Sequence, residues 1–163
     1  YGALLAGHTP RFVSKRSLAK GIPTVSFYLK HGGNALIDRD HRDQAMDAIA
    51  EMASEAERRD VSVVIFPEGT RSRTGELGDF RVGGLAAIMD AAPNLPIIPA
   101  VIEGSWRVFQ KNMFPVPYGA SVRVRFGEPI SRAVGESPVE VLERCRTWID
   151  FTLDEWRTAE GAT

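Results

Sequence analysis

Hydrophobic residues recur at helical spacing in two stretches of the chain. In residues 41–59 they form one stripe, which predicts a helix that buries a single face, with Asp40 as its N-cap; the stripe comprises Ala45, Ile49, Met52 and Ala56. A second helix is predicted over residues 82–91, because its apolar pattern ends shortly before Pro93.

A third helix is predicted from its first residues. Ser137-Pro138-Val139-Glu140 matches a capping box with proline at the first helical position. The pattern extends the helix to about Trp156 and places one set of side chains on a common face: Val141, Cys145, Trp148, Thr152 and Trp156.

Short apolar runs between the helices predict strands at 11–14, 35–37, 61–66 and 97–101. The β-branched run at 61–66 is typical of a buried central strand. Residues 122–126 alternate with period two, which predicts a half-buried strand with Arg123 and Arg125 on the solvent side. Residues 22–29 are apolar without a clear period. Strands that alternate with helices predict an α/β fold, with a central, mostly parallel or mixed sheet flanked by helices.

Length and composition narrow the class of protein. The 163 residues are 44% hydrophobic and 25% charged, which is typical of one folded domain and excludes a disordered chain. We therefore expect a single domain over residues 1–163. The lone Cys145 excludes an intrachain disulfide, and the helical stripe favours a core position for it. No run of 18 uncharged apolar residues is present, so the sequence predicts no membrane span.

Charge is unevenly distributed along the chain. Residues 1–42 hold seven Lys/Arg against two Asp, a net charge of +5, and the remaining residues therefore sum to −6. This asymmetry is compatible with an anionic partner for the first part of the chain, but on charge alone a solvated face is the favoured interpretation. A nucleic acid is not expected as a partner, because the sequence pI is near 6.4 and no nucleic-acid-binding motif is present.

The stretch Phe66-Pro67-Glu68-Gly69-Thr70-Arg71-Ser72 follows the predicted central strand directly. Ligands of open α/β sheets bind at the carboxyl ends of strands, where a guanidinium can hold a phosphate through two hydrogen bonds. Glu68 could orient Arg71 or accept a hydrogen bond from a substrate hydroxyl. The same composition also fits an ordinary surface loop whose charges compensate one another.

Residues 66–72 resemble the third signature block of the glycerolipid acyltransferases, the family of 1-acylglycerol-3-phosphate acyltransferase. The similarity spans roughly residues 11–105, where the blocks follow one another in the family's order. The carboxy-terminal third resembles the family only in general character. Four further stretches carry it: Phe12-Val13-Ser14-Lys15-Arg16-Ser17-Leu18, Gly33-Asn34-Ala35-Leu36-Ile37-Asp38-Arg39, Phe80-Arg81-Val82-Gly83 and Leu95-Pro96-Ile97-Ile98-Pro99-Ala100-Val101.

The resemblance implies a role for seven residues. Arg39 and Arg71 would bind the phosphate of the acyl acceptor, and Lys15 would add charge nearby. Three residues would shape that site and one would form a pocket wall: Glu68, Gly69, Thr70 and Pro99. Two arginines on separate strand-end loops can converge on one phosphate.

The resemblance also implies the reaction. It is the transfer of a fatty acyl group from acyl-CoA or acyl carrier protein to lysophosphatidate or a related phosphorylated glycerol, in phospholipid biosynthesis. It implies no metal or cofactor. It further implies a membrane-associated protein on the cytoplasmic side, anchored upstream or through a peripheral surface.

The family's His-x4-Asp block, which supplies the catalytic base, has no counterpart in this sequence. His8, His31 and His41 are followed five positions later by Val13, Leu36 and Met46. We expect the block to precede Tyr1, in which case residues 1–163 alone would have negligible activity. The alternatives are a non-catalytic relative that binds phosphate or anionic lipid, and His8 as a displaced base.

Two other candidate sites have ordinary explanations. His41 with Asp43 and Asp47 suggests a metal site, but helix-start charges explain these residues better. The apolar segment 106–118 would be either packed loop or a lip that contacts membrane or acyl chain, and packing is favoured.

Overall fold

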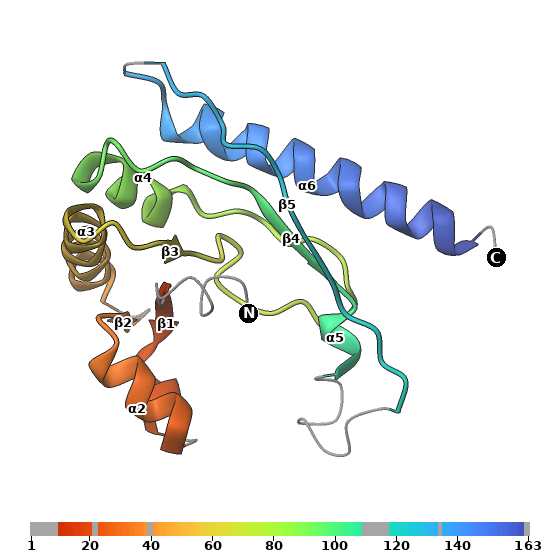
Figure 1. Cartoon of the computed structure of the whole chain (residues 1–163), viewed down its shortest axis with the longest axis horizontal. Helices are drawn as coiled ribbons and strands as arrows, with labels where there is room; N and C mark the ends of the chain where they lie inside the picture. The colour runs from red at the N-terminus through yellow and green to blue at the C-terminus, as the bar shows by residue number, and fades with distance from the viewer. Residues whose placement is uncertain (1–9, 21–22, 39–40, 109–117, 134, 162–163) are drawn as a thin grey trace. The chain divides into compact units, whose positions relative to one another are not determined.

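The computed structural model describes residues 10–20, 23–38, 41–108, 118–133 and 135–161 (Figure 1). The chain divides into two compact units. Unit 1 comprises Tyr1–Pro67 and Arg81–Leu95, and unit 2 comprises Glu68–Phe80 and Pro96–Thr163. Each unit has its own sheet and its own hydrophobic core. The expected single domain over residues 1–163 stays a prediction.

Unit 1 is built on a parallel three-stranded sheet, which confirms the α/β class. Strand β1 (Arg11–Lys15) lies between β2 (Ala35–Ile37) and β3 (Val63–Val64), with Val13 opposite Ala35 and Arg11 opposite Val63. The strands predicted at 11–14 and 35–37 are therefore confirmed. The interpretation of 61–66 as the central strand is wrong, because β3 is two residues long and lies at an edge of the described sheet.

Asn34 fixes the turn that leads into β2. Its Oδ1 accepts a hydrogen bond from the Phe12 backbone N–H at 2.8 Å, and its Nδ2 donates to the Tyr28 carbonyl at 2.8 Å. One amide side chain thus connects β1 to helix α2 (Pro23–His31). This helix contains residues 23–29 of the segment 22–29, whose type the sequence left ambiguous, and residue 22 lies outside the described residues. A short 3₁₀ helix, η1 (Arg16–Lys20), links β1 to α2.

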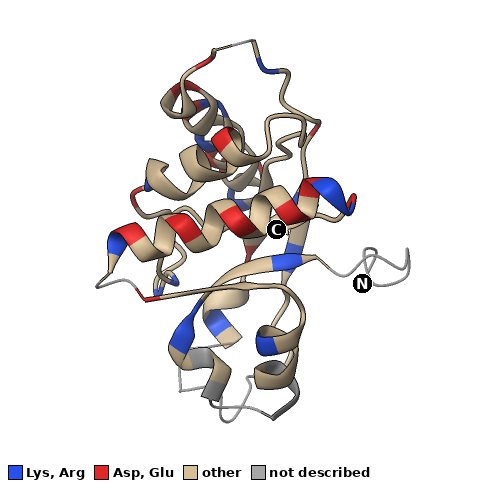
Figure 2. Ribbon diagram, turned by 90° about the vertical axis from the view of Figure 1, so that its left-hand side faces the viewer, with Lys and Arg blue, Asp and Glu red and all other residues tan. Residues whose placement is uncertain are grey.

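The predicted helix at 41–59 is confirmed as α3 (Arg42–Arg58), and all four residues of its stripe are buried. Figure 2 shows α3 in front, with acidic residues along its outward face and basic residues at both ends. The N-cap position is occupied by His41, which makes no side-chain capping bond, so the prediction of Asp40 as N-cap is wrong. The reason is that the helix begins one residue later than the pattern predicts, and helix ends are the least determined part of such a pattern.

Helix α4 (Val82–Ala91) is confirmed with the predicted bounds, and it packs against α3. Gly84 permits a close approach of α4 to Ile65, the residue that follows β3, because a Cβ on Gly84 would lie 2.5 Å from Ile65 Cδ1. Ile49, Met52 and Ile88 form the centre of the unit 1 core. The core therefore holds the helices on the sheet whose carboxyl edge carries part of the candidate site.

Unit 2 pairs β4 (Ala100–Glu103) with β5 (Arg123–Phe126) in an antiparallel sheet, and the long helix α6 (Pro138–Gly161) contacts β4 (Figure 1). A short helix, α5 (Ser105–Val108), follows β4. The capping box at the start of α6 is confirmed. Ser137 Oγ accepts from the Val139 N–H at 3.2 Å, and Glu140 Oε2 accepts from the Ser137 N–H at 3.3 Å.

The orientation predicted for β5 is wrong. Val124 and Phe126 are 52% and 72% exposed, and the guanidinium groups of Arg123 and Arg125 lie 5.1 and 5.0 Å from the centre of the Trp156 ring. Alternation defines two faces but not which face is buried, and here the indole of α6 binds the two cations. The predicted strand at 97–101 begins later, at Ala100, and is buried only at alternate positions.

Cys145 occupies the predicted core position on α6, and burial raises the pKa of its thiol. We expect iodoacetamide to alkylate Cys145 in the folded protein at least about tenfold more slowly than in urea, because the thiolate is the reactive form. Mass spectrometry of timed samples measures this rate. Equal rates in the two conditions would contradict a core position for the side chain.

Candidate functional site

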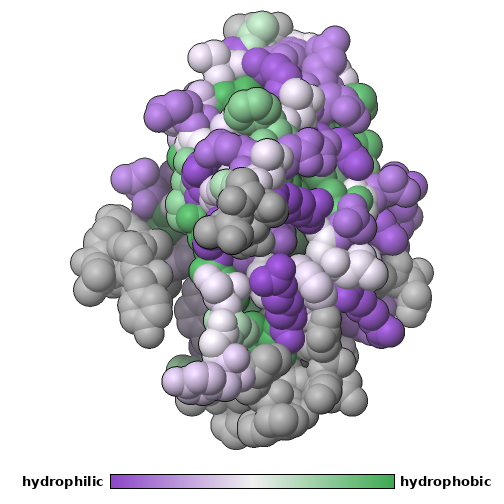
Figure 3. All heavy atoms as spheres, turned by 90° about the vertical axis from the view of Figure 1, so that its right-hand side faces the viewer, coloured by the Kyte–Doolittle hydropathy of each residue, from purple (hydrophilic) through white to green (hydrophobic). Residues whose placement is uncertain are grey.

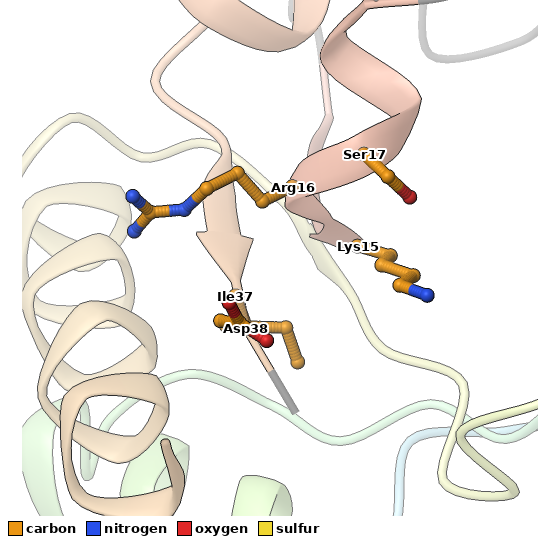
Figure 4. A pocket seen from close by; sticks show the side chains of 5 residues that line it. All are labelled: Lys15, Arg16, Ser17, Ile37 and Asp38. Carbon is orange, nitrogen blue, oxygen red and sulfur yellow. The ribbon is translucent and has the colours of Figure 1, made fainter. Parts of the chain in front are cut away.

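The carboxyl ends of β1 and β2 bring Lys15 and Asp38 to the same edge of the unit 1 sheet. Lys15 pairs with Ile37 in the parallel register, so the residues that follow each strand start side by side. A pocket of about 200 Å³ at this edge is lined by Lys15, Arg16, Ser17, Ile37 and Asp38 (Figure 4). Consecutive side chains at the end of β1, Lys15 and Arg16, extend in opposite directions in this view.

This edge provides cationic and hydroxyl groups on the surface. Lys15, Arg16 and Ser17 are exposed, and Asp38 is half-buried. Two cations and a hydroxyl are suited to binding an anionic group. The sequence pointed to Lys15 as a site residue, which stays a prediction, and did not point to Arg16 or Ser17, although the adjacent Lys-Arg-Ser at a predicted strand end was a usable signal. Arg39, predicted to bind phosphate, lies outside the described residues.

The signature loop leaves unit 1 after Pro67 and the chain re-enters it at Arg81. The Arg81 N–H donates a hydrogen bond to the Pro67 carbonyl at 2.9 Å, which holds the two ends of the intervening segment together. The segment between them, Glu68–Phe80, belongs to unit 2. Thr70 and Arg71 are exposed on the loop, so both are accessible to a ligand in solution.

Glu68 is held by the loop's own backbone. Its Oε2 accepts a hydrogen bond from the Gly78 N–H at 2.8 Å. Gly69, the next residue, has a φ of +66°, a conformation that glycine adopts without strain. Glu68 therefore shapes the loop through Gly78. Its predicted alternatives, orienting Arg71 or binding a substrate hydroxyl, stay predictions.

The far end of the loop is also fixed by side-chain hydrogen bonds. The Gly75 N–H donates to Ser72 Oγ at 2.9 Å, and Gly75 has a φ of +89°. A Cβ on Gly75 would lie 2.5 Å from Trp106 Nε1, so α5 closes off this side of the loop. Arg71 thus lies on a segment that is hydrogen-bonded on both sides of it.

Pro99 lines a pocket in unit 2, and its predicted place in the wall of the substrate pocket stays a prediction. The pocket has a volume of about 390 Å³, and Pro99, Pro129, Ile130 and Trp148 supply much of its lining, with Glu128 and Arg144 as its charged members. The Pro99 carbonyl accepts from the Gly127 N–H at 2.9 Å. Gly127 is required there, because a Cβ would lie 2.9 Å from both Pro99 Cγ and the Trp148 ring.

Among the described residues, no group of three or more His, Cys, Asp or Glu side chains is placed to hold a metal ion. His41 lies at the N-cap of α3, and the His31 ring lies 4.7 Å from the Phe27 ring. His8 and most of the apolar segment after Trp106, residues 109–117, lie outside the described residues. Tyr118, at the end of that segment, is fully exposed.

Comparison with known proteins identifies relatives of this chain. A family model described as acyltransferase matches residues 2–103. The chain is 36% identical over 94 residues to a 1-acyl-sn-glycerol-3-phosphate acyltransferase of Cocos nucifera. The aligned residues make up 58% of the chain and 30% of that protein. The Pseudomonas aeruginosa protein of the same name is 31% identical over 122 residues, covering 73% of the chain and 46% of that protein.

The Escherichia coli protein of this name is 43% identical over 71 residues, which cover 44% of the chain and 28% of that protein. The chain thus spans less than half the length of each of these three relatives. No solved structure matches it. The matched stretch includes the carboxyl ends of β1 and β2 with Lys15, the signature loop at 66–72 and Pro99, whereas α6 lies beyond residue 103.

Proposed function

Because the chain belongs to the acyltransferase family, we propose that this protein transfers a fatty acyl group to lysophosphatidate or a related phosphorylated glycerol, in phospholipid biosynthesis. The observation that carries the proposal is the loop at 66–72, which lies in the matched stretch and presents Arg71 on a hydrogen-bonded backbone. The relatives named above, all called 1-acyl-sn-glycerol-3-phosphate acyltransferases, support this acceptor class.

In the proposed reaction the acceptor hydroxyl attacks the carbonyl carbon of an acyl thioester. A base removes the hydroxyl proton, an ester forms, and the thiolate of acyl-CoA or acyl carrier protein leaves. Arg71, with Arg39 and Lys15, would bind the acceptor phosphate, while Glu68, Gly69 and Thr70 shape the loop and Pro99 forms a pocket wall. The base would come from a His-x4-Asp block that precedes Tyr1.

We further propose that the protein acts at the cytoplasmic surface of a membrane, where its acceptor resides. Basic residues in the first 42 positions and exposed apolar side chains of unit 2, among them Ile102, Val124 and Phe126, support a peripheral contact. Apolar patches lie between hydrophilic side chains on the face shown in Figure 3. Within the described residues, no helix combines the length and apolar character that crossing a membrane requires.

The acceptor class is tested with a protein extended upstream to include any His-x4-Asp block. We expect acyl transfer to lysophosphatidate and at least about tenfold less to monoacylglycerol, because only the former offers a phosphate to the arginines. Lipid extraction and mass spectrometry measure both products, with acyl-CoA and acyl carrier protein supplied in parallel as donors.

Two outcomes would contradict the proposal. Equal turnover of both acceptors would remove the phosphate-binding role. Absence of turnover by the extended protein, together with retained binding of anionic lipid vesicles, would favour the alternative of a non-catalytic relative that binds phosphate or anionic lipid.

A further inference from the structure

Helix α6 holds the loop that follows the signature block at two backbone carbonyls. Arg146 Nη1 donates to the Gly78 carbonyl at 3.1 Å, and Arg157 Nη2 donates to the Gly75 carbonyl at 2.6 Å. The two arginines are eleven residues apart, which is close to three helical turns, so they lie on the same face about 16 Å apart along the axis. The two carbonyls, three residues apart, can be separated by at most about 11 Å, so the side chains converge on the loop.

Each arginine is itself fixed by other contacts. Arg157 lies 3.6 Å from Glu103 Oε2 on β4, and Glu103 is buried. The Arg146 guanidinium lies 5.1 Å from the Phe80 ring centre, and its Nε lies 3.7 Å from Asp150 Oδ2. The Arg157–Glu103 pair joins α6 to β4, and the Arg146–Asp150 pair lies within α6. Neither ion pair involves the loop carbonyls. The hydrogen bonds to Gly75 and Gly78 therefore show that the loop is part of the arrangement.

The two glycines transmit these contacts into the signature block. Gly78 accepts from Arg146 through its carbonyl and donates through its N–H to Glu68. Gly75 accepts from Arg157 and donates to Ser72 Oγ. Arg71 lies in sequence between Glu68 and Ser72, whose side chains are each linked to α6 through one glycine.

We propose that Arg146 and Arg157 are positioning residues, which hold the loop in the conformation that presents Arg71 to the acceptor phosphate. The effect on KM that follows from this inference rests on the proposed function, whereas the effect on trypsin cleavage of the loop does not. It assigns a role to α6, which lies outside the stretch that the family model matches. Preorganised backbone contacts of this kind lower the entropic cost of binding a ligand.

Trypsin cleavage tests the structural part, because Arg71 and Arg73 are cleavage sites within the loop. We expect the variant Arg146→Ala/Arg157→Ala to be cut after these two residues on the order of tenfold faster than the native protein, since local opening controls cleavage. The control is Arg125→Ala, which removes an arginine whose side-chain hydrogen bonds go to Glu155 on α6 and not to the loop carbonyls. Mass spectrometry identifies the sites that are cut.

Arg146→Ala alone keeps the Arg157–Glu103 pair, so it tests the inference if the double variant fails to fold. In the extended enzyme we expect either variant to raise KM for lysophosphatidate severalfold and to leave KM for the acyl donor unchanged. Arg157→Lys should raise cleavage and KM less than Arg157→Ala does, because a lysine still donates a hydrogen bond to a carbonyl. Unchanged cleavage together with unchanged KM would overturn the inference, whereas faster cleavage in a protein without acyl transfer would sustain it and refute the proposed function.

Discussion

Replacing Arg71 by alanine is expected to lower kcat/KM for lysophosphatidate by about 30-fold to 5,000-fold in the extended enzyme. A guanidinium can bind a phosphate through two parallel hydrogen bonds, and truncating one partner of such a charge pair costs about 2–5 kcal/mol. We expect the loss mainly in KM, because the phosphate is remote from the bond that forms and is bound equally in ground and transition states. Steady-state kinetics at varied acceptor concentration measures it.

The matched control is Arg73→Ala, which removes the same side chain two positions further along the loop and is expected to change kcat/KM by less than about threefold. Arg71→Lys should fall between the native protein and Arg71→Ala, because lysine keeps the charge but not the planar fork. With monoacylglycerol as acceptor, the Arg71→Ala effect should disappear. Unaltered saturation by lysophosphatidate in Arg71→Ala would exclude the phosphate-binding role.

Local patterns predicted the helices well, because the forces that form them act within one or two turns. The capping box of Ser137 and Glu140 uses hydrogen bonds across three residues and is present as predicted. The stripe around Ile49 follows from helical periodicity alone and is buried. Such features need no knowledge of distant partners.

The features that the sequence did not predict depend on contacts between residues that are far apart in the chain. Alternation in β5 is visible in the sequence, but the buried face depends on Trp156, 33 positions after Arg123. Within the candidate site, the sequence indicated Glu68 and Arg71 because the signature block at 66–72 is contiguous, and their roles stay predictions. The bonds of Glu68 to Gly78 and of Gly78 to Arg146 join residues 10 and 68 positions apart, and no local pattern contains that information.

Replacing Trp156 by alanine is expected to lower the free energy of unfolding by about 3–5 kcal/mol, the range typical of a buried aromatic side chain cut to alanine. Trp156 is 8% exposed in the core of unit 2, where it packs with Val101 and Leu153. Its ring also carries the guanidinium groups of Arg123 and Arg125, whose contact would be lost. Urea unfolding followed by far-ultraviolet circular dichroism measures the change without relying on tryptophan fluorescence.

Phe151 supplies the control on the same helix, because its aromatic ring is 69% exposed. Phe151→Ala should change the free energy of unfolding by no more than about 0.5 kcal/mol, as is usual for surface substitutions. Leu77 and Phe80 of the loop pack against the Trp156 cluster, so Trp156→Ala should also speed trypsin cleavage after Arg71 and Arg73. Equal destabilisation by the two variants would contradict the assignment of α6's buried face, because only one of these aromatic side chains lies in the core.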